Sequence, residues 1–389
     1  MSKDGLIYLD NAATSWPKPH PVIKAMIDFN ENVGANPGRS GHRLSMDAAR
    51  IVFDAREGVA SLLNADDPLR VVFARNATEA LNTILLGSLL LKDHVVTSGM
   101  EHNSVMRPLR ALERQGLELS VTRCSDAGYI DPDDIKAAMK KNTRMVVVTH
   151  ASNVTGAITP VADIAKIAHA NDTILCVDAS QTAGSIPIHV MRDDIDILVF
   201  TGHKSLNGPQ GTGGFYIRGG LQKMVSPLEY GGTGSGSEFE EQPEFMPDRF
   251  ESGTPNTIGI AGLGAGVRFV ADRGVDLIRA REIALTGLLT DGIRSIKGVK
   301  IYGGTDPAQR IGIVSFTVES MSPSDVSLHL DERFNIMSRP GLHCAPAAHR
   351  TIGTFPQGTV RLSLGLFTTE EEINTAIKAI ETLSWENRK

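Results

Sequence analysis

The chain has 389 residues, of which 41% are hydrophobic and 22% are charged, and its formal net charge is -6. A chain of this length buries a substantial core, and the acidic balance argues against nucleic acid or an anionic membrane as a direct partner. The first residues lack a long apolar run, and the most apolar stretch, residues 81–91, is too short to span a bilayer. We therefore expect a cytoplasmic protein with two structural domains.

Short β-branched runs alternate with helical patterns in the first two thirds of the chain. These runs are RVVF at 70–73, HVVT at 94–97, MVVVTH at 145–150, ILCVDA at 174–179 and DILVFTGH at 196–203. Such alternation predicts βαβ units and a mostly parallel sheet with helices on both faces. Because ligands of open α/β sheets bind beyond the carboxyl ends of the strands, the residues that follow these runs are the candidates for a site.

The pattern changes after about Gly274, where a smaller α+β domain is expected. It would contain strands at 311–318 and 359–364, a helix at 322–334 and a closing helix from Thr369. We place the large domain at 16–272 and the small domain at 1–15 and 273–389. The segment 229–248 is rich in glycine, serine and acidic residues, which predicts an exposed mobile loop.

Lys204 ends the motif Thr201-Gly202-His203-Lys204, which directly follows an apolar run. A lysine held at the edge of a sheet is desolvated and loses its proton readily, as Schiff-base chemistry requires, whereas most lysines are simply solvated. Asp178 ends the run ILCVD, where it can either cap the next helix or keep a pyridine nitrogen protonated.

Three further strand ends carry polar side chains. His102 opens a helix, where it can stack on a planar ring or bond to backbone. Asn153 can donate to a phenolate oxygen or serve as a turn residue. Thr78, at the start of a helix, can contribute to an anion site or to a cap. Five weak signals thus fall at strand ends of one sheet, in a spacing that lets them converge on one crevice.

Eight motifs spread over nearly the whole chain carry a resemblance to a known family. They are YLDNAAT at 8–14, NATEALN at 76–82, MEHNS at 100–104, SNVTG at 152–156, VDASQ at 177–181, TGHK at 201–204, RFESGTPN at 249–256 and RPGLHCAP at 339–346. In this order the motifs resemble those of the class V aminotransferases, and within them the group II cysteine desulfurases and selenocysteine lyases. The resemblance implies the aspartate-aminotransferase-like (type I) fold, with a mostly parallel seven-stranded sheet in the large domain and a small α+β domain.

The resemblance also implies pyridoxal 5′-phosphate as the cofactor. Lys204 would carry it as a Schiff base, Asp178 would pair with the ring nitrogen, and His102 would stack on the ring. The other implied contacts are those of Asn153 and Gln181 to the phenolate oxygen and of Ala77, Thr78, Thr201 and His203 to the phosphate.

Thr254 matches a threonine that reaches the phosphate from the neighbouring subunit in the family, which implies a homodimer; the alternative is a cap of the following helix. Arg361 matches the arginine that binds the substrate carboxylate with its planar fork, the alternative being a surface arginine on a strand. Arg339 and His42 lie in further matching motifs, and with Asn153 they are additional substrate-binding candidates.

Cys344 decides between possible reactions, because desulfuration needs a thiol and transamination does not. The three cysteines of the chain are far apart and form no C-x-x-C pair, so we expect no metal site and a reducing compartment. Cys124 and Cys176 fit small buried hydrophobic residues. Cys344 instead lies in a loop with Pro and Gly, near Arg339 and His343, which favours a thiolate, and this loop resembles that of the desulfurase nucleophile.

The expected reaction is therefore conversion of L-cysteine to L-alanine. Lys204 abstracts the α-proton, and Cys344 attacks the sulfur to form a persulfide, which a sulfur-acceptor protein then takes, as in iron–sulfur cluster assembly. The alternatives are a selenocysteine lyase, or a class V aminotransferase or lyase for another amino acid in which Cys344 is incidental. The intact Lys204, Asp178, His102 and Arg361 argue against a scaffold without chemistry. Leu342 stands where the family commonly has a first histidine, which puts partner docking through that residue in doubt.

Overall fold

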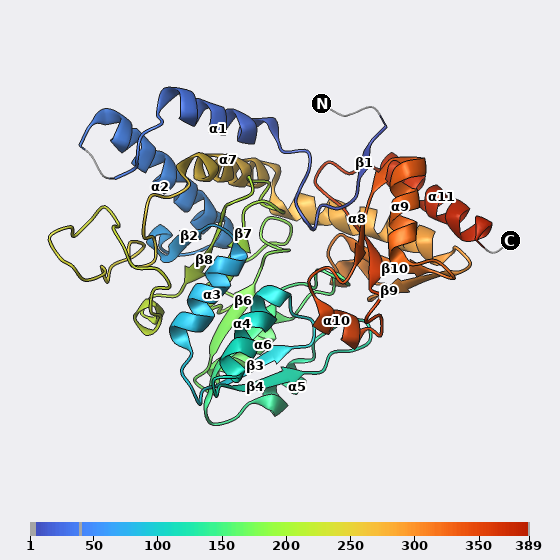
Figure 1. The fold of residues 1–389 in the computed structure, drawn as a ribbon, viewed down its shortest axis with the longest axis horizontal. Helices are drawn as coiled ribbons and strands as arrows, with labels where there is room; N and C mark the ends of the chain where they lie inside the picture. Colours follow the sequence, from blue (N-terminus) through green and yellow to red (C-terminus); the bar gives the residue numbers. More distant parts are fainter. Residues whose placement is uncertain (1–4, 39–40, 388–389) are drawn as a thin grey trace.

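The computed structural model describes residues 5–38 and 41–387, which contain a seven-stranded, a four-stranded and a two-stranded sheet (Figure 1). The elements up to residue 273 are β1 (Ile7–Tyr8), α1 (His20–Asn32), α2 (Arg43–Leu63), β2 (Val71–Ala74), α3 (Ala77–Ser88), β3 (His94–Ser98), α4 (Asn103–Glu113), β4 (Glu118–Thr122), α5 (Pro132–Ala138), β5 (Thr143–Thr149), α6 (Val161–His169), β6 (Ile174–Asp178), β7 (Ile197–Thr201), β8 (Gly213–Ile217) and α7 (Thr257–Arg273). Those that follow are α8 (Val275–Arg294), β9 (Val299–Tyr302), β10 (Ile313–Val318), α9 (Pro323–Phe334), β11 (Ile336–Met337), β12 (Arg339–Gly341), α10 (Pro346–Thr351), β13 (Thr359–Ser363) and α11 (Glu370–Glu386).

The larger sheet has seven strands in the order β2-β8-β7-β6-β5-β3-β4. All neighbouring strands are parallel except β8, which runs antiparallel to both β2 and β7. The five runs predicted from the sequence all form strands of this sheet. The expected mostly parallel α/β architecture is confirmed.

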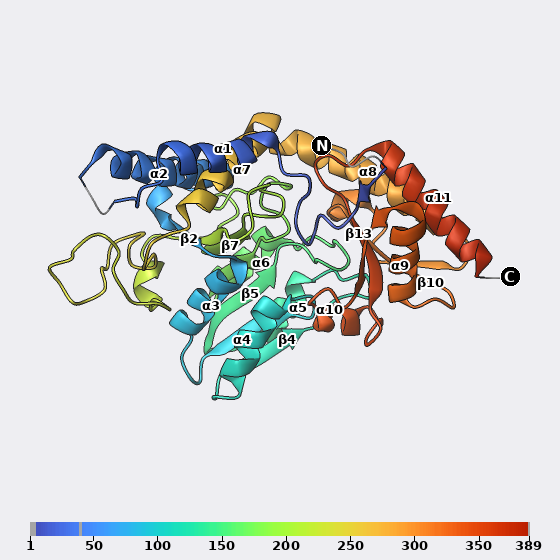
Figure 2. The same ribbon diagram turned by 45° about the horizontal axis from the view of Figure 1, so that its top comes forward.

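Helices cover both faces of this sheet. Side chains of α2, α6 and α7 share one core with it, and side chains of α3 and α4 share a second core on the opposite face. Figures 1 and 2 both show α1, α2 and α7 lying side by side. Because both faces are covered, the strands are apolar without alternation: Leu175 and Val177 join the first core and Cys176 the second. Cys176 is fully buried, as predicted.

The smaller sheet is antiparallel, with the order β12-β13-β10-β9, and α8, α9 and α11 pack on it around one core. Strand β1 pairs with β11, which joins residues 7–8 to this part of the molecule. The strands of the seven-stranded sheet thus all lie within 16–272 and those of the four-stranded sheet within 273–389. That division into domains stays a prediction, and its residues 1–4 and 388–389 lie outside the described residues.

The segment 229–248 contains no helix or strand, and much of it is exposed, as expected of a loop. Its aromatic side chains Tyr230, Phe239 and Phe245 are each more than half exposed. Arg75 Nη2 lies 2.7 Å from Glu229 Oε1, which ties one end of the loop to the large sheet. The mobility of this loop stays a prediction.

An ionic cluster lies at the amino ends of β6 and β7, away from the strand ends that carry the predicted site. His169 Nδ1 lies 2.7 Å from Asp194 Oδ2, and its Nε2 lies 2.7 Å from Asp196 Oδ2. Arg218 bonds to both carboxylates. Burial lowers the pKa of His169, but the hydrogen bonds and charges of Asp196 and Asp194 outweigh burial, so that the pKa is raised. The imidazolium can donate from both nitrogens.

Replacing His169 with Gln is expected to lower the free energy of unfolding by on the order of 1 kcal/mol at pH 6, and by less at pH 9. A histidine whose pKa is raised by folding stabilises the folded state fully below its unfolded pKa, and that contribution is lost as the pH rises through the folded pKa. Urea unfolding at both pH values measures the difference, with His20→Gln at an exposed position as the control. An equal loss at both pH values would contradict this assignment.

Candidate active site

A cavity of about 220 Å³ lies at the carboxyl ends of β2, β3, β5, β6 and β7. Eleven of the residues predicted from the sequence line it: Ala77, Thr78, His102, Asn153, Asp178, Gln181, Thr201, His203, Lys204, Arg339 and Arg361. The expected convergence of these strand ends on one crevice is therefore found.

Lys204 follows β7 and lies in this cavity. Burial lowers the pKa of its amine to about 8; Asp178 acts in the opposite direction, while Arg361 and Arg339 lower the pKa further. Near neutral pH an appreciable fraction of the amine is therefore unprotonated. This is the form that adds to a carbonyl carbon.

Asp178 ends β6 and is only 4% exposed. Its Oδ1 accepts a hydrogen bond of 2.9 Å from the backbone N of Ser180, and a second from the Ser180 hydroxyl. No helix follows before β7, so the helix-cap alternative is wrong. Among the described residues no cation forms an ion pair with this carboxylate, which leaves it suited to a cationic ring N–H.

His102 combines the two roles considered from the sequence. It caps α4, because its Nδ1 accepts a hydrogen bond of 3.1 Å from the backbone N of Ser104, and its ring also lines the cavity. Burial, and next the charge of Lys204, lower the pKa of His102 to about 4. Since Nδ1 accepts a backbone N–H, the neutral ring carries its proton on Nε2.

The end of the cavity near α3 fits a phosphate group. Asn76 caps α3, so Thr78 lies at the helix start as predicted, and the first N–H groups of the helix are available to an anion. Thr201 Oγ1 and His203 Nδ1 are buried in the same cavity and have no hydrogen-bond partner among the described residues. A buried polar group left unpaired costs about 1–3 kcal/mol, which a bound phosphate would relieve.

Two arginines line the cavity side by side, since Arg339 of β12 pairs in register with Arg361 of β13. Arg361 is 1% exposed, so the alternative of a surface arginine is wrong. Its Nη2 bonds to Asp10 Oδ1 at 2.7 Å and its Nη1 donates to the carbonyl oxygen of Asn153 at 3.0 Å. Asp10 lies in the motif YLDNAAT, but nothing in the sequence pairs it with Arg361.

Cys344 is the exposed member of the three free cysteines. Arg339 Nη2 lies 3.9 Å from its Sγ, which connects the thiol to a residue of the cavity wall. Two hydrogen bonds from the segments that follow β3 and β5 fix the loop: Asn103 N donates to Cys344 O at 2.8 Å, and Asn153 Nδ2 donates to His343 O at 2.7 Å. The thiol therefore lies next to the Lys204 cavity on an anchored loop.

His343 does not act as the sequence suggested. The residue is 4% exposed, lines the Lys204 cavity, and bonds through Nε2 to the carbonyl oxygen of Arg339 at 2.9 Å. Burial, and then the charge of Arg361, lower its pKa to about 2, so the ring is neutral and lends no positive charge to a thiolate. Of the two expected neighbours, only Arg339 brings a charge to Cys344.

Thr254 and His42 lie outside this cavity. Thr254 lines a separate hollow of about 460 Å³, together with Arg75 and Glu79. The helix α7 is capped by Asn256, whose Oδ1 accepts from Gly259 N, so the cap alternative for Thr254 is wrong. His42 caps α2. Neither residue joins Lys204 within its own chain.

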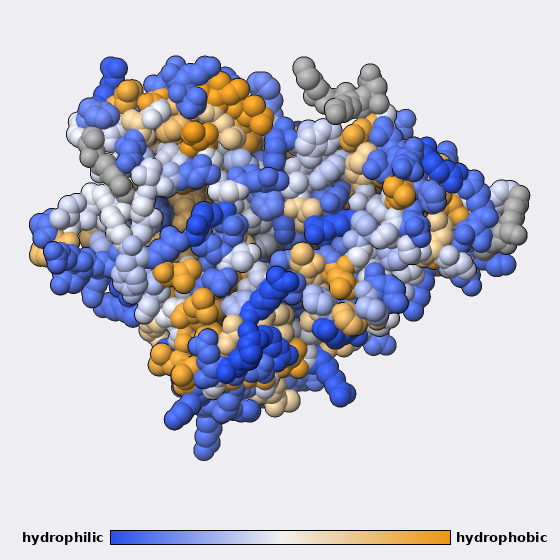
Figure 3. Space-filling model, viewed as in Figure 1, coloured by the Kyte–Doolittle hydropathy of each residue, from blue (hydrophilic) through white to orange (hydrophobic). Residues whose placement is uncertain are grey.

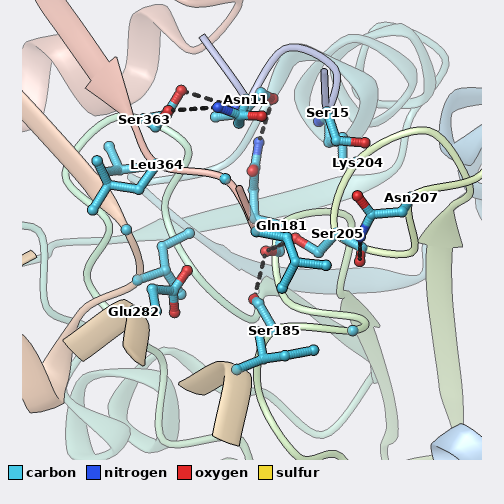
Figure 4. Close-up of a pocket in the computed structure, with 18 of the residues that line it drawn as sticks. Asn11, Ser15, Gln181, Ser185, Lys204, Ser205, Asn207, Glu282, Ser363 and Leu364 are labelled. Carbon is cyan, nitrogen blue, oxygen red and sulfur yellow. Dashed lines mark hydrogen bonds between the residues drawn. The ribbon is translucent and has the colours of Figure 1, made fainter. Parts of the chain in front are cut away.

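A second, smaller cavity of about 70 Å³ shares Lys204 and Gln181 with the first (Figure 4). Figure 4 shows Gln181 near Asn11 on one side and Ser185 on the other. Gln181 Nε2 donates to Ala12 O at 3.2 Å, and the backbone carbonyl oxygen of Gln181 accepts from Ser185 Oγ at 3.3 Å. Gln181 is thus held at the boundary between the two cavities.

The class of the protein follows from comparison with known families. The aminotransferase class-V family model matches residues 7–375, and the chain belongs to this family. The resemblance and the type I fold predicted from the sequence are confirmed. Among the described residues there is no cluster of three or more metal-ligating side chains, and no helix there has the length and apolar character needed to cross a membrane.

Curated relatives and solved structures narrow the comparison to cysteine desulfurases. A probable cysteine desulfurase of Methanothermobacter thermautotrophicus is 36% identical over 383 residues, which is 97% of this chain and 94% of that one. The apo structure of a cysteine desulfurase from Thermococcus onnurineus matches with a TM-score of 0.92 and 34% identity, over 98% of this chain and 95% of that one. Escherichia coli CsdA, a cysteine desulfurase in its S-sulfonic acid form, matches with a TM-score of 0.88 and 28% identity, over 99% and 96%.

Proposed function

We propose that this chain is a pyridoxal-5′-phosphate-dependent cysteine desulfurase that converts L-cysteine to L-alanine and transfers the sulfur to Cys344. The observation that carries the proposal is the position of Cys344, whose Sγ lies 3.9 Å from Arg339 while Arg339 lines the same cavity as Lys204. Transamination requires no thiol next to the cofactor-binding lysine.

The residues that would hold the cofactor divide into three groups. Lys204 would bind it covalently, and Asp178 and His102 would contact the ring. Thr78, Thr201 and His203 would hold the phosphate, with the backbone of Ala77, and Asn153 and Gln181 would contact the phenolate oxygen. When bound, the cofactor supplies an electron sink for the substrate α-carbon.

The remaining steps belong to the chain's own side chains. Arg361 and Arg339 bind the substrate carboxylate, and Lys204 Nζ takes the proton from Cα. The Cys344 thiolate then attacks the substrate sulfur, so that an S–S bond forms, the Cβ–S bond breaks and the electron pair goes to Cβ. Protonation at Cβ gives alanine. Enzyme thiol plus cysteine becomes enzyme persulfide plus alanine, and no external oxidant is required.

Alanine formation tests the proposal directly. The cofactor-loaded protein would be incubated with L-cysteine and, separately, with L-selenocysteine. Alanine from L-cysteine is the expected result. Alanine only from selenocysteine would make the protein a selenocysteine lyase, and none from either substrate would favour an aminotransferase or another lyase.

The proposal extends to a homodimer and to a sulfur-acceptor protein as partners. Thr254 lies outside the cavity of its own chain, so a contact with the phosphate would have to come from a second copy. Apolar side chains gather near α1 on the face drawn in Figure 3. The exposed apolar residues of α1 and α2 include Ile23, Ile27, Met46 and Phe53. A second subunit would cover such a surface. Absence of any disulfide among the described residues supports a reducing, cytoplasmic location.

Replacing Arg361 with Lys is expected to lower kcat/KM for L-cysteine roughly tenfold or more, mainly through KM. Lysine keeps the positive charge but cannot form the bidentate hydrogen bonds that a guanidinium group makes with a carboxylate. Steady-state kinetics would be compared with Arg333→Lys, an exposed arginine paired with Glu386 in the same part of the molecule. An unchanged KM in Arg361→Lys would remove Arg361 from substrate binding.

A further inference from the structure

Two buried histidines adjoin the Cys344 loop and have no part in the steps described above: His343 precedes Cys344 and also lines the Lys204 cavity, and His349 lies on α10. The rings of His343 and His349 have centroids 5.3 Å apart and planes inclined by 46°. Both residues are almost completely buried. One nitrogen of each ring, Nδ1 of His343 and Nε2 of His349, is buried without a hydrogen-bond partner among the described residues.

The hydrogen-bond partners fix which nitrogen of His343 carries the proton. Its Nε2 lies 2.9 Å from the carbonyl oxygen of Arg339, and a carbonyl oxygen only accepts, so Nε2 must be the donor. Burial keeps this ring neutral, since its pKa is lowered to about 2. Nδ1 of His343 is therefore a bare acceptor that lacks a donor.

His349 can supply the missing donor. Its Nδ1 lies 2.7 Å from the hydroxyl oxygen of Thr354, and burial lowers its pKa to about 4, so this ring is also neutral. The Thr354 hydroxyl has one proton, and we assign it to the 2.7 Å contact with Nδ1 because the other acceptor, the carbonyl oxygen of His349, is 3.5 Å away. The proton of His349 is then on Nε2, which is a buried N–H donor without a partner among the described residues. The opposite tautomer would leave two bare lone pairs in the same buried space, each costing about 1–3 kcal/mol.

We propose that one buried water bridges His349 Nε2 and His343 Nδ1, and that the resulting hydrogen-bond chain from Thr354 to the carbonyl oxygen of Arg339 positions Cys344 for attack. The two nitrogens form no direct hydrogen bond, and a water between them satisfies both. Every donor in the chain points toward Arg339, so the bonds polarise one another. This inference rests on the proposed function and adds His349 and Thr354 as positioning residues.

The backbone at the nucleophile explains why such support is needed. His343 and Cys344 both have left-handed backbone conformations, with φ of 50° and 58°. Non-glycine residues adopt this conformation at a cost, and it persists where the surroundings hold it. Asn103 and Asn153 hold the loop from the segments that follow β3 and β5. The histidine pair holds it through the carbonyl of the arginine that contacts Sγ.

Thr354→Val tests this series of hydrogen bonds with a small change, because it removes only the hydroxyl that orients His349. Thr354→Ser is the conservative variant that should restore it. Thr351→Val is the matched control, since the Thr351 hydroxyl is on α10, donates to Gly99 O at 3.1 Å and takes no part in the hydrogen bonds from Thr354 to Arg339. Long-range proton–nitrogen NMR of the imidazoles would report the tautomers. Amide exchange at Ala345, whose N–H donates to Leu342 O at 2.8 Å, would report the order of the loop.

In the wild type we expect both rings to be neutral with the proton on Nε2. In Thr354→Val the His349 tautomer should become mixed, amide exchange at Ala345 should accelerate about fivefold, and kcat for alanine should fall by a similar factor while KM for cysteine stays within about twofold. Thr354→Ser and Thr351→Val should behave as the wild type.

Unchanged tautomers, exchange and kcat in Thr354→Val, or a proton on Nδ1 of His343 in the wild type, would overturn the inference. Failure of this inference and failure of the proposed function are distinguishable. If the wild type forms no alanine, the imidazole tautomers and the amide exchange of Ala345 still show whether the hydrogen bonds from Thr354 to Arg339 are present.

Discussion

The variant Lys204→Ala is expected to lose alanine formation by on the order of 1,000-fold or more, and to lose its bound cofactor on gel filtration. Lys204 is the lysine of the cavity in which the phosphate-binding end, Asp178 and the two arginines meet. Burial lowers the pKa of its amine to about 8. The same amine would serve as covalent anchor and as proton acceptor, so its removal would abolish two roles together. Visible absorbance of the purified protein and the alanine assay measure these losses.

Lys18 provides a demanding control for this variant. Burial also lowers the pKa of Lys18 to about 8, and its Nζ donates to the carbonyl oxygen of His203 at 2.9 Å, but it does not line the Lys204 cavity. Lys18→Gln should therefore retain the cofactor. If Lys204→Ala kept the visible absorbance of the wild type, or if both variants lost it equally, Lys204 would not be the anchoring residue.

The second large effect is expected for Cys344→Ser, which should lower alanine formation from L-cysteine by about 100-fold or more. The change is close to isosteric and leaves the hydrogen bond to the Cys344 carbonyl in place, but a hydroxyl does not attack a sulfur atom as a thiolate does. Binding of cysteine to the cofactor-loaded protein, followed by absorbance, should persist. Only the step that breaks the Cβ–S bond would be lost.

Cys124→Ser is the matched control, because burial raises the pKa of the Cys124 thiol to about 11 and makes it a poor nucleophile. It should leave alanine formation unchanged. Full activity of Cys344→Ser with L-cysteine would make Cys344 incidental and would favour a lyase acting without a protein thiol. Activity that persists only with L-selenocysteine would restrict the role of Cys344 to sulfur.

The sequence predicted β2, β3, β5, β6 and β7, whose apolar runs are conspicuous, but it did not predict the parallel edge strand β4, whose residues are mostly not buried and give no apolar run. It did not reveal β8, whose first residues belong to a glycine-rich stretch that looks like a loop. The structure explains these glycines: a Cβ on Gly213 would lie 2.9 Å from the backbone of Asn76, and one on Gly214 would meet the carbonyl oxygen of Val72. Close approach of neighbouring backbone, which a linear pattern does not express, made these positions glycine.

Within the site, residues at strand ends could be predicted because topology brings strand ends together. The contacts that depend on side-chain direction could not. His343 adjoins Cys344 in sequence, yet its ring is buried and bonds to the carbonyl oxygen of Arg339, whereas Cys344 is exposed. The partnership of Asp10 with Arg361 joins positions 351 residues apart in the chain. Thr254 and His42 match family motifs, but nothing in one chain brings them to Lys204.

The central claim is that sulfur moves from the substrate to Cys344, and mass spectrometry of the protein after a single turnover tests it most directly. Cofactor-loaded protein would receive one equivalent of L-cysteine without reductant, and the peptide containing Cys344 would be isolated under conditions that preserve persulfides. The account predicts one added sulfur atom on Cys344, none on Cys124 or Cys176, and one alanine released for each persulfide formed. Alanine released in full while Cys344 remains an unmodified thiol would contradict it.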